Sequence, residues 1–208
     1  MEVYYKTMSN LIDYQKGADI LLNPNVESQL VYGKGWAYGA EFFLKKKEGK
    51  LTGWISYTLS RTLRQFTEIN HGNSYPAKQD RIHDISIVGI FHASDRWTLA
   101  STWVFNTGDA VTFPSGAYNM NGRITPYYTD RNGYRMPSYH RLDFSATNTK
   151  KLKGNRERSW NFSIYNVYAR RNAYAINFRP DPNDLKKTQA VRVSLFSIIP
   201  SVTYNFKF

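Results

Sequence analysis

The sequence contains no cysteine and no long apolar run. The absence of cysteine excludes a disulfide framework, thiolate zinc sites and cysteine nucleophiles. The longest mainly apolar stretches, such as residues 85–91, have the length of a strand, whereas a transmembrane helix needs about 20 apolar residues. If the chain lies in a membrane, it must therefore cross with strands.

Signatures of catalysis and of metal binding are missing as well. No Gly-x-Ser-x-Gly, phosphate-binding glycine loop or His-Glu-x-x-His occurs. Residues 181–184 are acidic but lack the glycine and the distal glutamate of a calcium loop. Asp80 and Asp84 flank His83 at a strand start, where we expect a solvated rim. The four histidines show no metal-ligand spacing: His71, His83, His92 and His140. We expect no catalytic residues, no metal and no cofactor, and so not an enzyme.

Aromatic residues and positive charge are abundant. The chain of 208 residues has 16 Tyr, 12 Phe and 5 Trp, yet its mean hydropathy is −0.56. Its net charge is +12. Basic residues are spread over most of the chain, with the densest group at 150–158, so we do not expect a nucleic-acid partner. Anionic lipid headgroups and lipopolysaccharide are more natural partners for this charge.

Apolar and polar side chains alternate through three pairs of segments. The first pair is 36–45 with 51–61, the second is 83–92 with 97–106, and the third is 139–149 with 159–168. Side chains alternate between the two faces of a strand, so each pair presents one apolar and one polar surface. Very short turns join the two members of each pair.

The alternation is longest at the carboxy terminus, over residues 190–208. Pro200 interrupts it, and because proline cannot donate to a strand ladder we expect a bulge there. An opening strand over 3–8 brings the total to about eight. The sequence therefore predicts an all-β, antiparallel fold.

Long polar loops separate the pairs. They cover residues 9–32, 65–81, 107–138 and 170–188. Short turns at one end of the strands and long loops at the other are typical of transmembrane β-barrels of outer membranes. The stretch from Trp97 to Phe105 covers about 26 Å, or about 20 Å of membrane at a tilt of about 40°, near the height of the apolar band. Trp97, Trp160 and Phe208 are then expected at one rim, at the level of the lipid headgroups.

Four motifs occur in an order that resembles a known family. Residues 137–146 contain Tyr-His-Arg-Leu-Asp, and residues 160–174 contain Asn-Val-Tyr-Ala-Arg-Arg-Asn. Residues 35–43 have the form Gly-x-Ala-x-Gly-x-Glu-Phe, and 194–208 end in alternating aromatics with a terminal Phe. Together these resemble late strands of TonB-dependent outer-membrane receptors of Bacteroidetes-type bacteria.

The resemblance implies that residues 1–208 are the carboxy-terminal portion of an outer-membrane β-barrel domain. Such receptors also have a plug domain and a 22-stranded barrel, and neither the plug nor an export signal is recognisable here. We therefore expect the native protein to begin upstream. It would import a scarce nutrient (an iron chelate, glycan, cobalamin or peptide) at the cell outer membrane. TonB would act through the absent plug, and a surface lipoprotein is a further candidate partner.

Two groups of residues are candidates for ligand binding. The richest loop, 107–138, carries rings that stack on ligands and amides or guanidinium groups that orient them: Tyr118, Asn119, Asn121, Arg123, Tyr127, Tyr128, Arg131 and Tyr134. The alternative is a wet surface loop rich in turn-forming residues. By strand parity, Glu41, Arg141 and Asp143 are expected to face the lumen. Tyr204, Phe206 and Phe208 resemble the signal that the barrel-assembly machinery reads, and lipid contact is the simpler role.

Two other functions compete with the importer. The chain could be a complete eight-stranded outer-membrane barrel that serves as an adhesin or structural anchor. It could also be a soluble β-sandwich that binds polyanions, as the net charge suggests. Solubility without detergent would separate the third possibility from the other two.

Overall fold

The computed structural model describes residues 1–15, 17–18, 23–120, 123–128, 130–154, 156–182 and 184–208. In this part of the chain the regular structure is antiparallel strand, with two short 3-10 turns at Val26–Gln29 and Asn70–Gly72. None of the helices found there is long and apolar enough to cross a membrane. The expectation of an all-β, antiparallel fold is confirmed.

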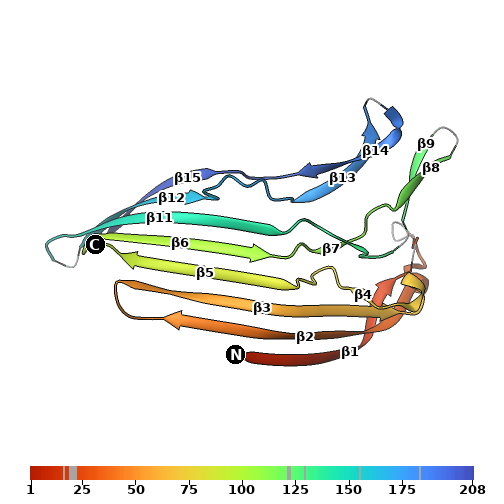
Figure 1. The fold of residues 1–208 in the computed structure, drawn as a ribbon, viewed down its shortest axis with the longest axis horizontal. Coiled ribbons are helices and arrows are strands. Elements are labelled where there is room, and N and C mark those ends of the chain that lie inside the picture. The colour runs from red at the N-terminus through yellow and green to blue at the C-terminus, as the bar shows by residue number, and fades with distance from the viewer. Residues whose placement is uncertain (16, 19–22, 121–122, 129, 155, 183) are drawn as a thin grey trace.

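Eight strands form the main sheet and lie side by side in chain order (Figure 1). They are β1 (Glu2–Tyr14), β2 (Leu30–Lys46), β3 (Leu51–Phe66), β5 (His83–His92), β6 (Trp97–Asn106), β11 (Tyr139–Lys151), β12 (Glu157–Tyr165) and β15 (Ile199–Lys207). A ninth, β4 (Tyr75–Pro76), pairs only with β3. Strands β1 and β15 end the order, and neither has a second partner among the described residues. The sheet is therefore open at both edges.

Three small sheets lie mainly within segments that the sequence assigned to loops. The hairpin β13 (Ala175–Asp181) with β14 (Asp184–Val193) and the hairpin β8 (Gly116–Met120) with β9 (Arg123–Tyr127) stand away from the main sheet (Figure 1). Strand β7 (Ala110–Val111) pairs with β10 (Tyr134–Arg135). The single strand expected over 190–208 is wrong, because β14 ends at Val193 and β15 begins at Ile199.

The bulge expected at Pro200 is also wrong. Pro200 pairs with Ile164 in a register that continues without a shift from Tyr165 to Glu157. The proline is the second residue of an edge strand, a place where a missing N–H is tolerated. A bulge occurs instead in β1, where the register shifts between Met8 and Leu11.

The register puts most of the large apolar side chains of the eight strands on one face. The row Leu44, Ile55, Ile87, Trp103 and Leu142 runs across five consecutive strands through directly opposite pairs. A second row, four residues nearer the short turns on each shared strand, continues to the edge: Leu51, Phe91, Leu99, Ala146, Phe162 and Val202. Nothing in the described structure covers this face, and Leu44 is 71% exposed.

Serine, threonine and charged side chains occupy most of the opposite, polar face. Ser56, Ser86, Val104 and Arg141 lie in one row, and Thr102 pairs with Asp143 in the next. The strand parity read from the sequence thus places Glu41, Arg141 and Asp143 together on the polar face.

The two ends of the sheet differ. The short turns β2–β3, β5–β6 and β11–β12 gather with the carboxy terminus at one end, called here the turn end, and the long connections lie at the other, the loop end (Figure 1). Trp97 and Trp160 both pair with Asn148, so they flank β11 at the turn end. Tyr204 is directly opposite Trp160, with ring centroids 4.8 Å apart. Aromatic rings therefore line this margin of the apolar face.

The buried core is small and lies at the loop end. Val31, Phe66, Ile69 and Tyr75 are packed together, with Leu11 against them. A Cβ at Gly33 would come within 2.6 Å of the Phe66 ring, so glycine lets this ring lie flat on β2. Burial raises the pKa of the Tyr75 phenol, and the nearby Asp13 carboxylate raises it further. This core holds the loops onto the polar face.

We expect Phe66→Ala to lower the free energy of unfolding by about 3–5 kcal/mol, the usual cost of removing a buried aromatic ring. Phe66 is 1% exposed. The matched control is Phe43→Ala, since Phe43 is 62% exposed and should change stability by less than about 1 kcal/mol. Denaturant titration of the purified protein measures both, and equal effects would contradict the assignment of the core.

Candidate functional site

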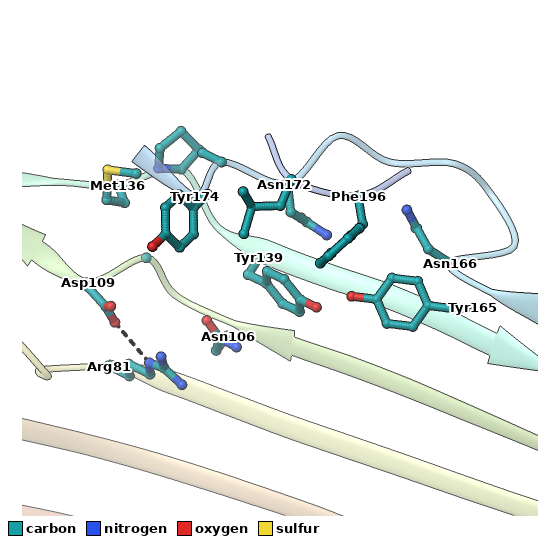
Figure 2. A pocket seen from close by; sticks show the side chains of 14 residues that line it. Arg81, Asn106, Asp109, Met136, Tyr139, Tyr165, Asn166, Asn172, Tyr174 and Phe196 are labelled. Carbon is teal, nitrogen blue, oxygen red and sulfur yellow. Dashed lines mark hydrogen bonds and ion pairs between the residues drawn. The ribbon is translucent and has the colours of Figure 1, made fainter. Parts of the chain in front are cut away.

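An open cavity of about 450 Å³ lies on the polar face at the loop end. Its size falls within the range of small-molecule sites. Five segments that are far apart in the sequence contribute to it (Figure 2). The lining residues are Arg81, Asn106, Gly108, Asp109, Met136, Pro137, Tyr139, Tyr165, Asn166, Asn172, Ala173, Tyr174, Leu195 and Phe196.

Arg141 positions two of the three tyrosines that line the cavity. Its Nη1 donates to the hydroxyl oxygens of both Tyr139 and Tyr165 at 2.9 Å, and its Cζ lies 4.1 Å from the centre of the Tyr165 ring. Figure 2 shows the two hydroxyl groups directed toward each other across the cavity. Each phenol oxygen accepts from the guanidinium, and the two hydroxyl groups also interact with each other. The pair therefore offers a ligand fixed polar contacts on rigid strands.

Asp143 connects Arg141 and its two tyrosines to the loop that begins at Asn166, called here the roof of the cavity. One carboxylate oxygen accepts from Arg141 Nε at 2.9 Å, and the other accepts from the backbone N–H of Asn166 at 2.9 Å. The Asn166 side chain is buried and donates to the carbonyl oxygens of Arg170 and Ser197 at 2.9 and 2.7 Å. One carboxylate on β11 thus holds both the tyrosine pair and the loop that begins at Asn166.

Asn172 fastens the same loop to β11. Its side-chain amide accepts from the backbone N–H of His140 at 3.2 Å and donates to the His140 carbonyl oxygen at 2.9 Å. This copies the paired bonds of a neighbouring strand. Arg170 Nη2 adds a bond of 3.1 Å to the Ser138 carbonyl oxygen. Tyr168, which bonds His140 Nδ1 at 2.7 Å, has its pKa raised by partial burial.

The far wall of the cavity carries an ion pair. Arg81 Nε lies 3.0 Å from Asp109 Oδ1, and the side chains are 44% and 40% exposed (Figure 2). An exposed pair of this kind contributes at most about 1 kcal/mol to stability. Both groups can therefore exchange their mutual contact for contacts to a ligand at little cost.

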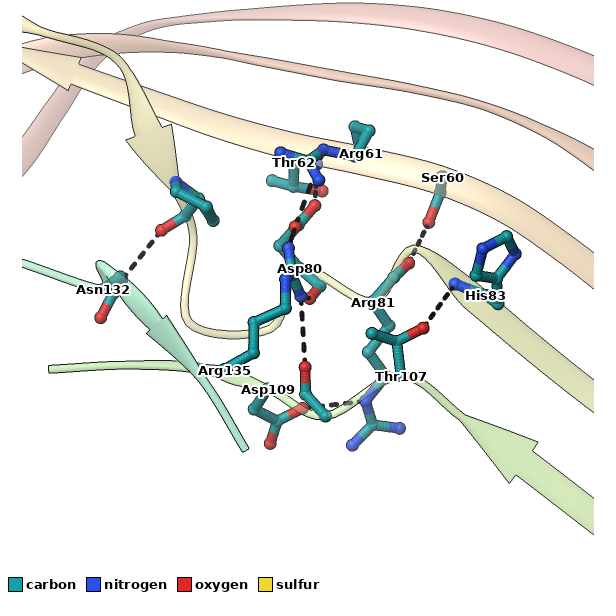
Figure 3. A network of polar contacts seen from close by, with 12 residues as sticks. Ser60, Arg61, Thr62, Asp80, Arg81, His83, Thr107, Asp109, Asn132 and Arg135 are labelled. Atoms are coloured by element: carbon teal, nitrogen blue, oxygen red, sulfur yellow. Dashed lines mark hydrogen bonds and ion pairs between the residues drawn. The ribbon is translucent and has the colours of Figure 1, made fainter. Parts of the chain in front are cut away.

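A second network braces the loops beside the cavity (Figure 3). Asp80, expected at a solvated rim, is 1% exposed, so that expectation is wrong. Its carboxylate accepts from the backbone N–H of Thr62 at 2.5 Å, forms an ion pair with Arg135, and has Arg61 Nε at 3.9 Å. Arg135 also donates to the Gly108 carbonyl oxygen at 3.2 Å. The buried carboxylate is possible because cations and backbone donors surround it.

The loop residues expected to bind a ligand do not line this cavity. Tyr118 and Tyr127 are exposed on the β8–β9 hairpin, and Tyr128 directly follows it. Asn119 and Arg123 lie on the strands of the same hairpin, and Asn121 lies outside the described residues. The hairpin stands away from the sheet (Figure 1).

The other two loop candidates support the fold locally. Arg131 pairs with Asp13 at 2.7 Å, and its backbone exchanges two hydrogen bonds with the Asn70 side chain. The Tyr134 ring lies 5.8 Å from that of Phe113. The seven candidates that the structure describes thus lie either on and next to the β8–β9 hairpin or in contacts that support the loops.

The candidates on the sheet are also separated. Arg141 and Asp143 adjoin the cavity, whereas Glu41 lies on β2 near the other edge. Tyr204 and Phe206 lie on the apolar face of β15, and Phe208 packs on Phe206 with ring centroids 4.9 Å apart. Sequence reasoning missed the lining residues Asn166 and Asn172. Both belong to the Asn-Val-Tyr-Ala-Arg-Arg-Asn motif at 166–172, which was the available signal.

The described residues include no group of three or more His, Asp or Glu side chains placed to hold a metal ion. Comparisons with family models, with curated proteins and with solved structures find no match to this chain. The case for a function therefore rests on the geometry of the sheet and on the polar groups at its loop end.

We expect Asp80→Ala to lower the free energy of unfolding by about 3 kcal/mol, because it leaves Arg135 and Arg61 without their anion. The control is Asp109→Ala, which breaks an exposed pair and should cost at most about 1 kcal/mol. Denaturant titration gives both values, and limited proteolysis should show faster cleavage near residue 135 in Asp80→Ala alone. A cost for Asp80→Ala no larger than for the control would contradict the buried brace.

Proposed function

We propose that this chain forms part of the wall of an outer-membrane β-barrel, in a TonB-dependent transporter that imports a scarce nutrient. The observation that carries the proposal is the predominantly apolar face of the main sheet, which the register extends from β2 to β15. A face of this kind is stable only against lipid or another apolar layer.

The accessible surface area of the chain is larger than that of a typical folded monomer, which supports an apolar environment around it. A folded monomer of 24.2 kDa typically has about 10,000 Å² of accessible surface, whereas this chain exposes 14640 Å². Strand β5 and its neighbours present large side chains outward, such as Ile55, Ile87 and Phe91. Lipid chains would cover these groups without requiring any polar partner.

The ends of the sheet support an orientation. Short turns with aromatic rings at one end and long loops at the other match the periplasmic and outer ends of bacterial barrels. The polar face would then line the lumen. The cavity between Tyr139, Tyr165 and Arg81 would open toward the outside, where a ligand arrives.

The open edges favour a larger barrel. Unpaired backbone groups are not tolerated in lipid, so both β1 and β15 need a strand beside them. Further strands of the parent protein would supply these partners, and a plug would link ligand capture to TonB. Tyr204, Phe206 and Phe208 would serve the barrel-assembly machinery during insertion.

The alternative is a complete eight-stranded barrel that acts as an adhesin or anchor. The main sheet has eight strands in its path, a number that can close. Closure would require β1 to pair with β15, which end the strand order on opposite sides. A soluble β-sandwich is disfavoured, because the small sheets of the described chain have two strands each and none covers the apolar face.

Cysteine labelling tests the membrane face. These 208 residues contain no cysteine, so each introduced thiol is the only one in this part of the protein. Ile55 and Ser56 are neighbours on β3 with side chains on opposite faces. In intact outer membranes we expect a membrane-impermeant maleimide to label Ser56→Cys and to react several-fold more slowly with Ile55→Cys. Labelling of detergent-denatured samples gives the total amount of thiol, to which both labelling rates are normalised. Equal labelling rates would rule out lipid against the apolar face.

The mass of the native protein separates the two barrels. Eight strands occupy 24.2 kDa here, so a 22-stranded transporter barrel would weigh about 65 kDa before its plug is counted. We expect intact-mass measurement of outer-membrane protein carrying these residues to give at least that value. A mass near 24 kDa would reject the transporter and leave the small closed barrel.

A further inference from the structure

The turn end of the sheet carries most of the positive charge. Residues 45–50, 92–96, 150–158 and 207–208 contain eleven of the 28 lysines and arginines but only three of the 16 acids. They account for +8 of the net charge of +12. These segments are spread along the sequence, and the fold gathers them at one end (Figure 1).

Among the described residues, five arginines at the loop end have acidic partners, whereas the cations of the turn end do not. At the loop end Arg61, Arg81, Arg131, Arg135 and Arg141 all form ion pairs with aspartates. In the described part of the chain, none of the eleven turn-end cations forms an ion pair. This end therefore presents a net charge of +8.

Three of these cations lie on the apolar face itself. Lys150 and Arg158 are opposite each other, two residues beyond the row of Trp97, Asn148 and Trp160. Lys46 extends β2 beyond Leu44 on the same face. Two residues correspond to about 7 Å along a strand. The apolar face thus ends in aromatic rings followed by a margin of cations, here called the basic margin: Lys46, Lys150 and Arg158.

We infer that the basic margin binds the phosphate headgroups of anionic glycerophospholipids in the membrane leaflet that surrounds the turn end. This inference rests on the proposed membrane location. Lysine and arginine stems can lie along acyl chains while their charged ends reach the phosphate level. The aromatic row would mark the boundary between acyl chains and headgroups. Charge complementarity favours anionic over zwitterionic lipid at this depth.

Fluorescence quenching by brominated lipids tests the inference. The complete protein is reconstituted in phosphatidylcholine vesicles that contain a small fraction of either brominated phosphatidylglycerol or brominated phosphatidylcholine. Trp36, Trp54 and Trp103 are replaced by Phe, so that within this chain Trp97 and Trp160, next to the basic margin, report which lipid is in contact. We expect an association constant about fivefold higher for the anionic lipid, which corresponds to the interaction of one basic residue with an anionic surface.

Two triple variants isolate the basic margin. Lys46→Gln/Lys150→Gln/Arg158→Gln should bind both lipids equally. The control, Lys78→Gln/Arg171→Gln/Arg192→Gln, removes the same charge from exposed residues outside the turn end and should keep the preference. At an ionic strength of about 1 M, where the screening length is about 3 Å, the preference of the unmodified protein should weaken.

The outcomes separate this inference from the proposed function. Equal quenching of the unmodified protein by both lipids overturns the inference and leaves the barrel intact. Quenching by neither lipid removes the barrel and the inference together. If excess soluble glycerol phosphate abolishes the preference, the basic margin recognises free phosphate, and the lipid assignment is wrong. If the control loses the preference as fully as the margin variant, net charge and not the basic margin is responsible.

Discussion

The register of the main sheet is the constraint on which the rest of the structure depends. Side chains alternate with a period of two, so a slip of one residue would exchange the two faces of a strand. From Leu44 on β2 to Val202 on β15, most large apolar residues lie on one side, although Phe43, Trp54 and Val88 lie on the polar side. The polar face can then hold the cavity, because the opposite face takes up the apolar side chains.

The sheet was predictable from the sequence because alternation is a local signal. Strands β5 and β6 have the bounds that the pattern indicates, and β2, β3 and β11 extend beyond them by a few residues. The hairpins β8–β9 and β13–β14 were missed because they stand outside the sheet and lack its apolar face. Asn166 was expected inside a strand, but its φ of 57° ends β12 and begins the roof of the cavity.

The candidate site was predictable only in part. The alternation of side chains along a strand predicted that Arg141 and Asp143 lie on the polar face. There they hold the tyrosines that line the cavity. The remaining lining residues come from loops whose approach depends on contacts across long stretches of sequence, such as Asn166 with Ser197. The loop 107–138 was predicted to bind a ligand because it is rich in aromatic and polar residues. Composition alone does not show that Tyr118 lies on an exposed hairpin or that Arg131 forms a structural ion pair.

The bulge in β1 determines which way the start of the chain turns its side chains. Three steps along β1, from Met8 to Leu11, match two steps along β2, from Gly35 to Gly33, and Asn10 absorbs the extra residue with a φ of 55°. Leu11 therefore reaches the Phe66 core and Asp13 reaches Arg131 on the polar side. Had the ladder continued from Met8 without the bulge, Leu11 would pair with Tyr32, and both Leu11 and Asp13 would lie on the apolar face. The one extra residue therefore keeps the core contact and the ion pair on the polar side of the sheet.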